Sequence, residues 1–328
     1  MILIVWVDDI IIACNDPATR DRFKKHLCDL FSMKDLGEIS LFLGIEFSRE
    51  DDSVKMCQSQ FVSRVLKRFD MENCKPRSTP CEMSPNSHGS PDESEPADST
   101  LYRQIVGSLI YIMIATRPDL CYAVTKLSQH MSNPTVADLV VAKHVLRYLK
   151  GTTDKGLIFK KSSVPLKLKG YCDSDWGSSD DRKSVTGYCF MLSDEGPVIS
   201  WKSRKQQTVA LSTCEAEYMA LSAATQEGKF LVQLYKDMIP DHMIESDAVQ
   251  DFDLHCDNQG AMALAKNPVQ HQRSKHIDIR YHYIRDEIMS GCANLLYVPT
   301  ADNVADIFTK PVVKTRMNKF SLPLTGIQ

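Results

Sequence analysis

The second half of the chain alternates apolar and polar residues with the two-residue period of β-strands. Three such runs follow one another and are predicted as strands: Leu166–Asp173, Thr186–Leu192 and Val198–Lys202. A turn-like segment, Ser193–Pro197, separates the last two. From Ser212 the apolar residues recur with helical spacing, which predicts a long helix. Two later runs, Phe252–Cys256 and Asn294–Val298, are predicted as further strands, and strands together with helices indicate an α/β arrangement.

The first half of the chain has hairpin and helix patterns. Two short hairpins are predicted, Ile2–Val7 with Ile10–Cys14 around Asp8-Asp9, and Ile39–Ser48 with Val54–Gln58 around Asp51-Asp52. Asp16–Phe31 reads as a helix because Asp16 suits the N-cap and Pro17 the first helical position, with Phe23, Leu27 and Leu30 on one side. A second helix is predicted over Gln60–Phe69.

The middle of the chain contains a polar, proline-rich segment followed by a segment with helical periodicity. Pro76–Thr100 is rich in Pro, Ser, Asp and Glu with little to bury, which predicts a flexible linker. Leu101–Gly151 then shows three apolar stripes at helical spacing, interrupted near Pro118 and Pro134. We expect three helices there.

Composition narrows the class of protein. A chain of 328 residues suggests two or three domains, and a hydrophobic share of 43% is enough for packed cores. The net charge of −3 does not indicate nucleic-acid binding, which would need local basic patches. Eleven cysteines without CxxC pairs favour reduced thiols. The apolar start Met1–Val7 is too short for a membrane span, so we expect no signal peptide, no transmembrane segment and an intracellular location, cytoplasmic or nuclear.

Several long motifs resemble one family. They are Trp6-Val-Asp-Asp9, Ile199–Thr213 followed by Glu215-Ala-Glu-Tyr218, Cys256-Asp-Asn-Gln259, Lys275–Ile279 and Ala305–Lys310. Together they resemble the C-terminal part of copia-type LTR retrotransposon Pol polyproteins. The resemblance implies residues 1–79 as a truncated reverse-transcriptase palm remnant, 80–100 as a linker and 101–160 as a helical thumb or connection. It further implies residues 161–316 as a ribonuclease H-like domain, with a mixed five-stranded sheet and flanking helices, and 317–328 as a tail.

Four acids stand at ends of predicted strands or starts of predicted helices: Asp173, Glu217, Asp257 and Asp306. The resemblance implies that they are catalytic and hold two Mg²⁺ ions, with Mn²⁺ as a substitute. Converging carboxylates suit Mg²⁺ because this ion prefers oxygen ligands. Asp306 is expected in the first turn of a helix that Asp302 or Asn303 caps and Pro311 ends.

Alternatives exist for two of these acids. Asp175 shares a strand face with Asp173 and is the fallback for it. Glu215 and Glu217 are about 200° apart on a helix, and Glu217 lies on the apolar stripe with Leu221. A carboxylate on a buried stripe needs a special reason, so Glu217 is preferred.

The turn Asp8-Asp9 resembles the metal-binding turn of a reverse-transcriptase palm, with Trp6 where the family has tyrosine. On local sequence alone an ordinary acidic turn is the simpler interpretation. Polymerases of this type need a further aspartate on an earlier strand, so we expect no polymerase activity from this chain. The polymerase portion of the polyprotein is an expected partner.

Two basic clusters are candidates for nucleic-acid binding: Lys202, Arg204 and Lys205, and Arg273 with Lys275. The resemblance implies RNA·DNA hybrids as the substrate and hydrolysis of the RNA strand as the reaction. The main alternative is a catalytically silent, hybrid-binding or inert relic of a decayed element. An integrase-like strand transferase fits less well, because the last acid is an aspartate on a helix after a fifth strand.

Overall fold

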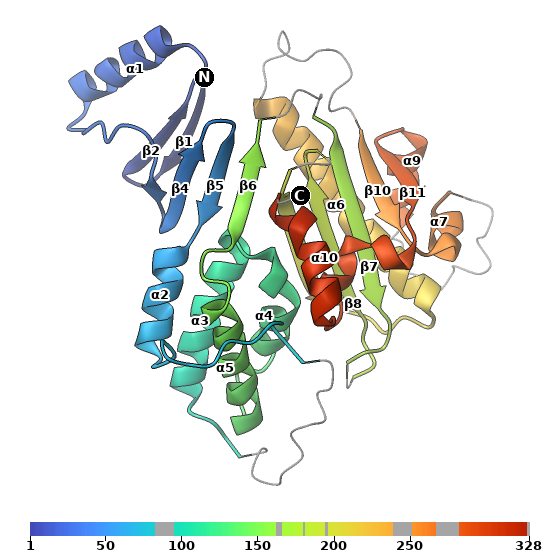
Figure 1. The fold of residues 1–328 in the computed structure, drawn as a ribbon. Coiled ribbons are helices and arrows are strands. Elements are labelled where there is room, and N and C mark those ends of the chain that lie inside the picture. Colours follow the sequence, from blue (N-terminus) through green and yellow to red (C-terminus); the bar gives the residue numbers. More distant parts are fainter. Residues whose placement is uncertain are drawn as a thin grey trace.

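A computed structural model describes residues 1–82, 95–161, 166–179, 181–193, 196–238, 251–266 and 282–326. Its largest sheet has five strands in the order β11-β10-β7-β8-β9 (Figure 1). They are β7 (Leu168–Asp175), β8 (Val185–Met191), β9 (Val198–Lys205), β10 (Phe252–Cys256) and β11 (Ala293–Tyr297). Strand β10 is parallel to β7 and β11, whereas β8 is antiparallel to both its neighbours. This is the ribonuclease H topology, and it confirms the predicted mixed sheet.

Helices cover both faces of this sheet. The long helix α6 (Thr213–Met238) packs on β7, β8 and β10, together with α7 (Gln259–Lys266) and α9 (Tyr283–Met289). The opposite face carries the 3₁₀ helix η7 (Val304–Phe308) and α10 (Lys314–Thr325). Every residue of β8 is buried because Tyr188 and Phe190 face the α6 core while Cys189 and Met191 face the α10 core.

A second, antiparallel sheet lies in the N-terminal half, in the order β3-β4-β5-β6. Its strands are β3 (Leu41–Phe42), β4 (Ile45–Glu50), β5 (Ser53–Cys57) and β6 (Gly156–Lys160). Residues 101–160 were expected as a helical connection with helices up to Gly151, and the strand β6 at its end was not predicted. The short run Gly156–Lys160 becomes a strand because β5 offers it a free edge, with Met56 opposite Leu157.

The helical connection forms one core with the preceding helix. Its elements are α2 (Ser59–Arg68), α3 (Ser99–Ala115), η3 (Pro118–Leu120), α4 (Cys121–Ser128) and α5 (Val136–Lys150). Val62 and Leu66 of α2 pack with Leu109 and Leu146 of the connection in a single buried cluster. The expected boundary near residue 79 therefore does not separate two hydrophobic cores.

The ends of the predicted linker are held by the connection. Pro80 is buried, the Arg77 amide donates to the Arg147 carbonyl at 3.2 Å, and the His144 ring lies 2.9 Å from the Thr79 carbonyl. These contacts correct the linker interpretation for residues 76–82. The centre of that segment, 83–94, lies outside the described residues.

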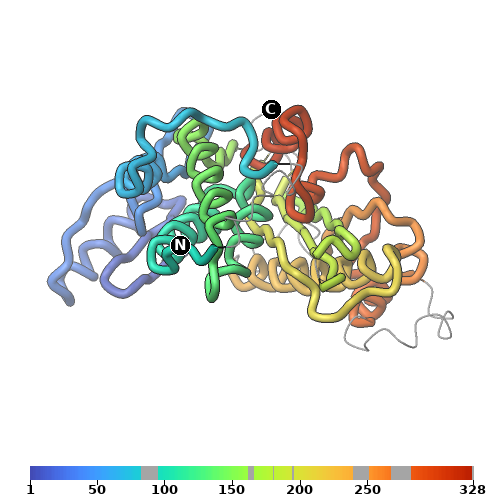
Figure 2. The backbone as a smooth tube through the Cα atoms, turned by 90° about the horizontal axis from the view of Figure 1, so that it is seen from below, coloured from blue at the N-terminus to red at the C-terminus, as the bar shows by residue number. Residues whose placement is uncertain are grey.

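The N-terminal elements are packed least. The hairpin β1 (Ile2–Trp6) and β2 (Asp9–Ala13) forms as predicted, and Asp16 caps α1 (Pro17–Leu30) by accepting from the amides of Ala18 and Thr19. No residue of α1 is buried, which differs from the expected core-facing stripe. Figure 2 shows these segments and the five-stranded sheet on opposite sides of the connection. Among the described helices, none combines the length and apolar character needed to cross a bilayer.

Candidate active site

Four carboxylates approach the central strand β7 from different elements. Asp173 lies on β7 itself, Glu217 in the first turns of α6, Asp257 directly after β10, and Asp306 within η7. Three are almost fully buried, with exposed fractions of 2% for Asp173, 6% for Glu217 and 0% for Asp306, while Asp257 is half-buried. Burial of that much acid is costly without compensating partners.

Glu217 is tied directly to β7. One of its carboxylate oxygens, Oε1, accepts a hydrogen bond from the Ser174 amide at 3.1 Å. The other oxygen, Oε2, is buried and has no hydrogen-bond donor. Because polar atoms buried in proteins are nearly always paired, this oxygen is an exception that calls for a ligand.

The neighbouring glutamate has a different role. Glu215 is also buried, with 8% exposed, which differs from the expectation that only Glu217 turns inward. Its Oε2 accepts from the Leu211 amide at 2.8 Å and so closes the turn that precedes α6. Glu215 is therefore engaged in starting the helix, and the open oxygen belongs to Glu217.

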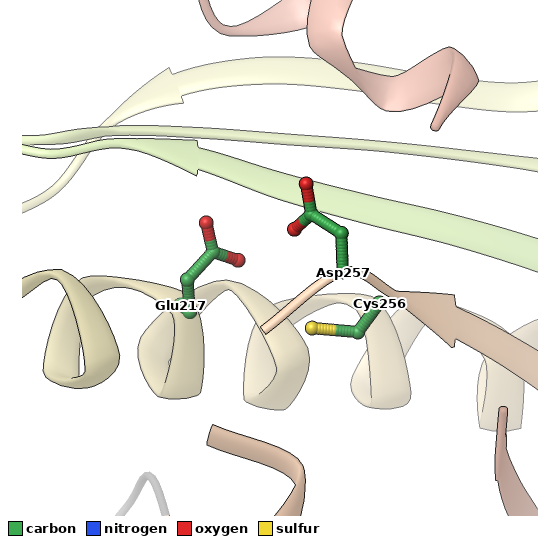
Figure 3. Close-up of side chains that lie close together, drawn as sticks. All are labelled: Glu217, Cys256 and Asp257. Carbon is green, nitrogen blue, oxygen red and sulfur yellow. The ribbon is translucent and has the colours of Figure 1, made fainter. Parts of the chain in front are cut away.

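Asp257 lies beside Glu217. Figure 3 shows the side chains of Glu217, Cys256 and Asp257 converging from α6 and the end of β10. The ligand atoms of these three side chains all lie within 4.8 Å of one another. The presence of a thiol in this group was not anticipated from the sequence.

Asp306 lies on a different type of helix from the one expected. Its segment is the 3₁₀ helix η7 rather than the first turn of an α-helix. Asn303, one of the two predicted caps, caps this helix: its side-chain oxygen accepts from the Ala305 amide at 3.1 Å. Its side-chain amide also donates to the Cys172 carbonyl at 2.9 Å. The second of these bonds attaches η7 to β7.

Gly187 allows η7 to come close. It lies opposite Asp173 in the β7–β8 register, and a Cβ there would stand 2.7 Å from atoms of Phe308 and Thr309. With η7 in place, the Thr309 hydroxyl donates to Asp173. The sequence motif contains Thr309, but its role depends on a contact across 136 residues of chain.

Two cations lie among the acids. The Lys310 ammonium is 2.8 Å from Asp306 Oδ1 and 3.5 Å from Asp173 Oδ2, and Arg316 of α10 also forms an ion pair with Asp306. These partners compensate part of the buried negative charge. Neither was identified as a site residue from the sequence.

Burial and mutual repulsion disfavour the charged forms of two acids. Burial raises the pKa of Asp173 to about 7, helped by Asp306 and Asp257 and opposed by Lys310 and Thr309. The pKa of Glu217 is likewise raised well above its ordinary value, by burial first and then by Asp173. A bound cation would relieve this repulsion.

Three of the four acids offer oxygens that suit Mg²⁺, whereas the fourth, Asp306, already has cationic partners. Asp173, Glu217 and Asp257 offer carboxylate oxygens, one of them without a donor, which are the ligands Mg²⁺ prefers. Asp306 is already ion-paired with Lys310 and Arg316. Those two side chains would have to move before Asp306 could ligate an ion.

Of the other predicted acids, Asp175 lies near this group, whereas Asp8 and Asp9 belong to a different sheet. Asp8 lies in the turn of the β1–β2 hairpin and Asp9 is the first residue of β2, and both are exposed. Asp175, the fallback, is half-buried at the end of β7.

The basic residues of β9 lie beside the sheet's edge. Lys202, Arg204 and Lys205 are the last residues of the strand rather than of a turn, and with α6 they line a hollow of about 310 Å³. Lys205 is also 2.9 Å from Asp181. The second predicted cluster, Arg273 and Lys275, lies outside the described residues.

Comparisons with known proteins identify the family. Residues 1–83 match the family described as reverse transcriptase (RNA-dependent DNA polymerase). The retrovirus-related Pol polyprotein from transposon TNT 1-94 of Nicotiana tabacum is 40% identical over 98% of this chain. A putative transposon Ty5-1 protein of Saccharomyces cerevisiae is 31% identical over 68% of this chain and 72% of its own length. The chain belongs to the copia-type retrovirus-related Pol polyproteins.

This membership confirms the resemblance seen in the motifs. The chain spans 24% of the tobacco polyprotein's length, so the activities of the whole polyprotein are not thereby assigned to it. Among solved structures, the RNase H1 of Halobacterium salinarum is 19% identical and overlaps 44% of this chain and 94% of its own, with a TM-score of 0.28.

Proposed function

We propose that residues of the C-terminal sheet hydrolyse the RNA strand of RNA·DNA hybrids with two Mg²⁺ ions. Asp173, Glu217, Asp257 and Asp306 are the proposed catalytic and metal-binding residues. The observation that carries the proposal is the buried, donor-free oxygen of Glu217, whose carboxylate neighbours are Asp173 and Asp257 from two other segments.

The chain's own residues would prepare the site. The Ser174 amide and the Thr309 hydroxyl fix the orientations of Glu217 and Asp173, so that these two side chains need little rearrangement. Burial keeps bulk water away from these carboxylates. When bound, Mg²⁺ supplies an activated water and stabilises charge on the leaving oxygen.

Substrate contact is proposed for the basic end of β9. Lys202 and Arg204 are exposed and separated by two positions, so they project from the same side of the strand toward a backbone phosphate. Arg273 and Lys275 are proposed as a second contact. Hybrids would be recognised through backbone shape and the 2′-hydroxyl rather than through sequence.

Cleavage of a labelled RNA·DNA hybrid by the purified chain tests the proposal. We expect cutting of the RNA strand only, dependent on Mg²⁺ or Mn²⁺, with at least about a hundredfold loss in Asp173→Asn. Asp175→Asn is the matched control because it changes the neighbouring acid of the same strand, and it should retain most activity. Equal activity of Asp173→Asn and the unsubstituted chain would refute the assignment.

The second candidate is a catalytically silent relic that retains the fold. The two cations on Asp306 favour it, because they balance the charge of that carboxylate without a metal ion. A folded chain that binds hybrid but cuts it neither with Mg²⁺ nor with Mn²⁺ would support the relic.

A further inference from the structure

A thiol shares the proposed metal site. Cys256 is fully buried at the end of β10, and its Sγ lies within 4.8 Å of ligand atoms on Glu217 and Asp257 (Figure 3). The proposed Mg²⁺ chemistry has no use for sulfur, because Mg²⁺ takes oxygen ligands. Cys256 belongs to the buried core beside α6, and its sulfur also lies next to the two carboxylates.

The surroundings of Cys256 resemble those of a metal-bound thiolate. The Asn258 amide donates to its Sγ at 3.4 Å, and the thiol donates in turn to the Asn258 carbonyl at 3.9 Å. The neighbouring Cys172 thiol donates to the His255 carbonyl instead. Donors of this kind hold a ligating sulfur in position. The Oε2 of Glu217, in the same group, is buried and accepts no hydrogen bond, so it can still bind a cation.

One sulfur with two carboxylates matches the preference of a thiophilic divalent ion. Zn²⁺ binds sulfur at about 2.3 Å and carboxylate oxygen at about 2.0–2.2 Å in a tetrahedron, so ligand atoms around it are roughly 3.5 Å apart. The three side chains would need to close by only about 1 Å from their present spread to meet that geometry. Water or a substrate oxygen would complete the fourth position.

We propose that Glu217, Cys256 and Asp257 bind Zn²⁺ or Cd²⁺, and that this ion excludes Mg²⁺ from the candidate active site. Binding exchanges the S–H bond of Cys256 for a metal–sulfur bond and releases the proton to solvent. The inhibitory consequence rests on the proposed nuclease function, whereas the binding itself does not.

Cd²⁺ added in equal amount to the full chain tests binding without substrate. A cadmium–thiolate charge-transfer band should appear in the ultraviolet, and Cys256→Ser should remove most of it. Cys172→Ser is the matched control, because that thiol is equally buried and adjacent but lies outside the three-residue group. Cys256→Ala serves as a second variant, and circular dichroism checks that each variant folds.

Zn²⁺ titration of hybrid cleavage at constant Mg²⁺ tests inhibition. We expect Cys256→Ser to need at least about tenfold more Zn²⁺ than Cys172→Ser for the same fractional inhibition. Absence of the cadmium band from the unsubstituted chain, or its full persistence in folded Cys256→Ser and Cys256→Ala, would overturn the site. A chain that binds Cd²⁺ through Cys256 but cuts no hybrid would leave the site standing and refute only the nuclease.

Discussion

At the scale of single residues, Lys310 has the most direct effect on the charge of the candidate site. Its ammonium lies between Asp173 and Asp306, where it neutralises part of a buried cluster of negative charge. Burial acts to lower the pKa of Lys310, but Asp173 and Asp306 outweigh it and raise the pKa above its ordinary value. The ammonium therefore remains charged, and it competes with any metal ion for the same oxygens.

Replacing Lys310 with methionine should make the fold more dependent on Mg²⁺. Without metal we expect Lys310→Met to lower stability by about 1–3 kcal/mol, because buried carboxylates lose a partner. With Mg²⁺ the ion takes over that charge, so the rise in Tm on adding Mg²⁺ should be larger than in the unsubstituted chain. Thermal melting with EDTA and with Mg²⁺ measures both effects.

Lys319→Met is the control for Lys310→Met. Lys319 also pairs with an aspartate, Asp302, but both side chains are more than half exposed, so its loss should cost less than about 1 kcal/mol. The same Mg²⁺ response in Lys310→Met as in the unsubstituted chain would show that Lys310 and the metal do not compete.

The sequence predicted where residues lie when their position follows from a local element. Asp173 and Asp257 were expected near strand ends and Glu217 on an apolar helical stripe, and the structure places them on β7, directly after β10 and on α6. Thr309, Lys310 and Gly187 were missed as site residues. Their roles depend on η7 packing against β7 and β8, which no local pattern encodes.

At the scale of elements, a buried ionic network fixes the connection between α3 and α5. Arg117 and Asp119, both almost fully buried, form a two-pronged pair with distances of 3.0 and 2.9 Å. The Tyr148 hydroxyl of α5 donates to Asp119 at 2.7 Å, and Lys155 lies 3.3 Å from it. These bonds hold the turn around η3 against the last turn of α5.

Asp119→Asn should destabilise the chain strongly and in a pH-dependent way. Burial acts to raise the pKa of Asp119, but Arg117, Lys155 and the hydrogen bonds hold it well below the ordinary value. A lowered pKa contributes stability above the unfolded-state pKa of about 3.9, and that stability is lost as the pH falls through the folded-state pKa. We expect Asp119→Asn to cost about 3–5 kcal/mol near neutral pH and less below about pH 4.

Urea unfolding of the unsubstituted chain and of Asp119→Asn, from neutral pH to about pH 3, measures the difference in their free energies of unfolding. Asp21→Asn is the control, because it breaks an exposed pair with Arg20 and should cost less than about 1 kcal/mol at any pH. A cost for Asp119→Asn that stays constant down to about pH 3 would contradict the ionic origin of the effect.

Strands and helices were predicted correctly where the apolar residues of the element itself show the period. They were missed where the element forms only by pairing or packing with a distant segment. The boundaries of β10 agree with the sequence, since Phe252, Leu254 and Cys256 form an alternating buried face. By contrast, β6 exists because β5 leaves an edge unpaired about a hundred residues earlier in the chain. The last segment, expected as a tail, became α10 because its apolar residues find a surface that two regions share.

At the scale of the whole molecule, α10 joins the C-terminal sheet to the N-terminal half. Phe320 and Leu324 pack with Leu157 of β6 and with Val198 of β9 in one buried cluster. The helix ends at Gly326 in a left-handed conformation, φ +74°, where a Cβ would stand 2.1 Å from the Ile158 carbonyl of β6. The same helix carries Arg316 to Asp306, so it also connects this junction to the candidate site.

Phe320→Ala should therefore loosen both regions together. Removing a fully buried ring is expected to cost about 3–5 kcal/mol, and hydrogen exchange should accelerate in β6 as well as in β9. Leu322→Ala is the matched control, because it lies on the same helix with 43% of its surface exposed and should change neither strand. Faster exchange confined to α10 would mean that the helix packs on the two regions without holding them together. Residues 317–328 would then contribute little to the stability of either region, as expected of a tail.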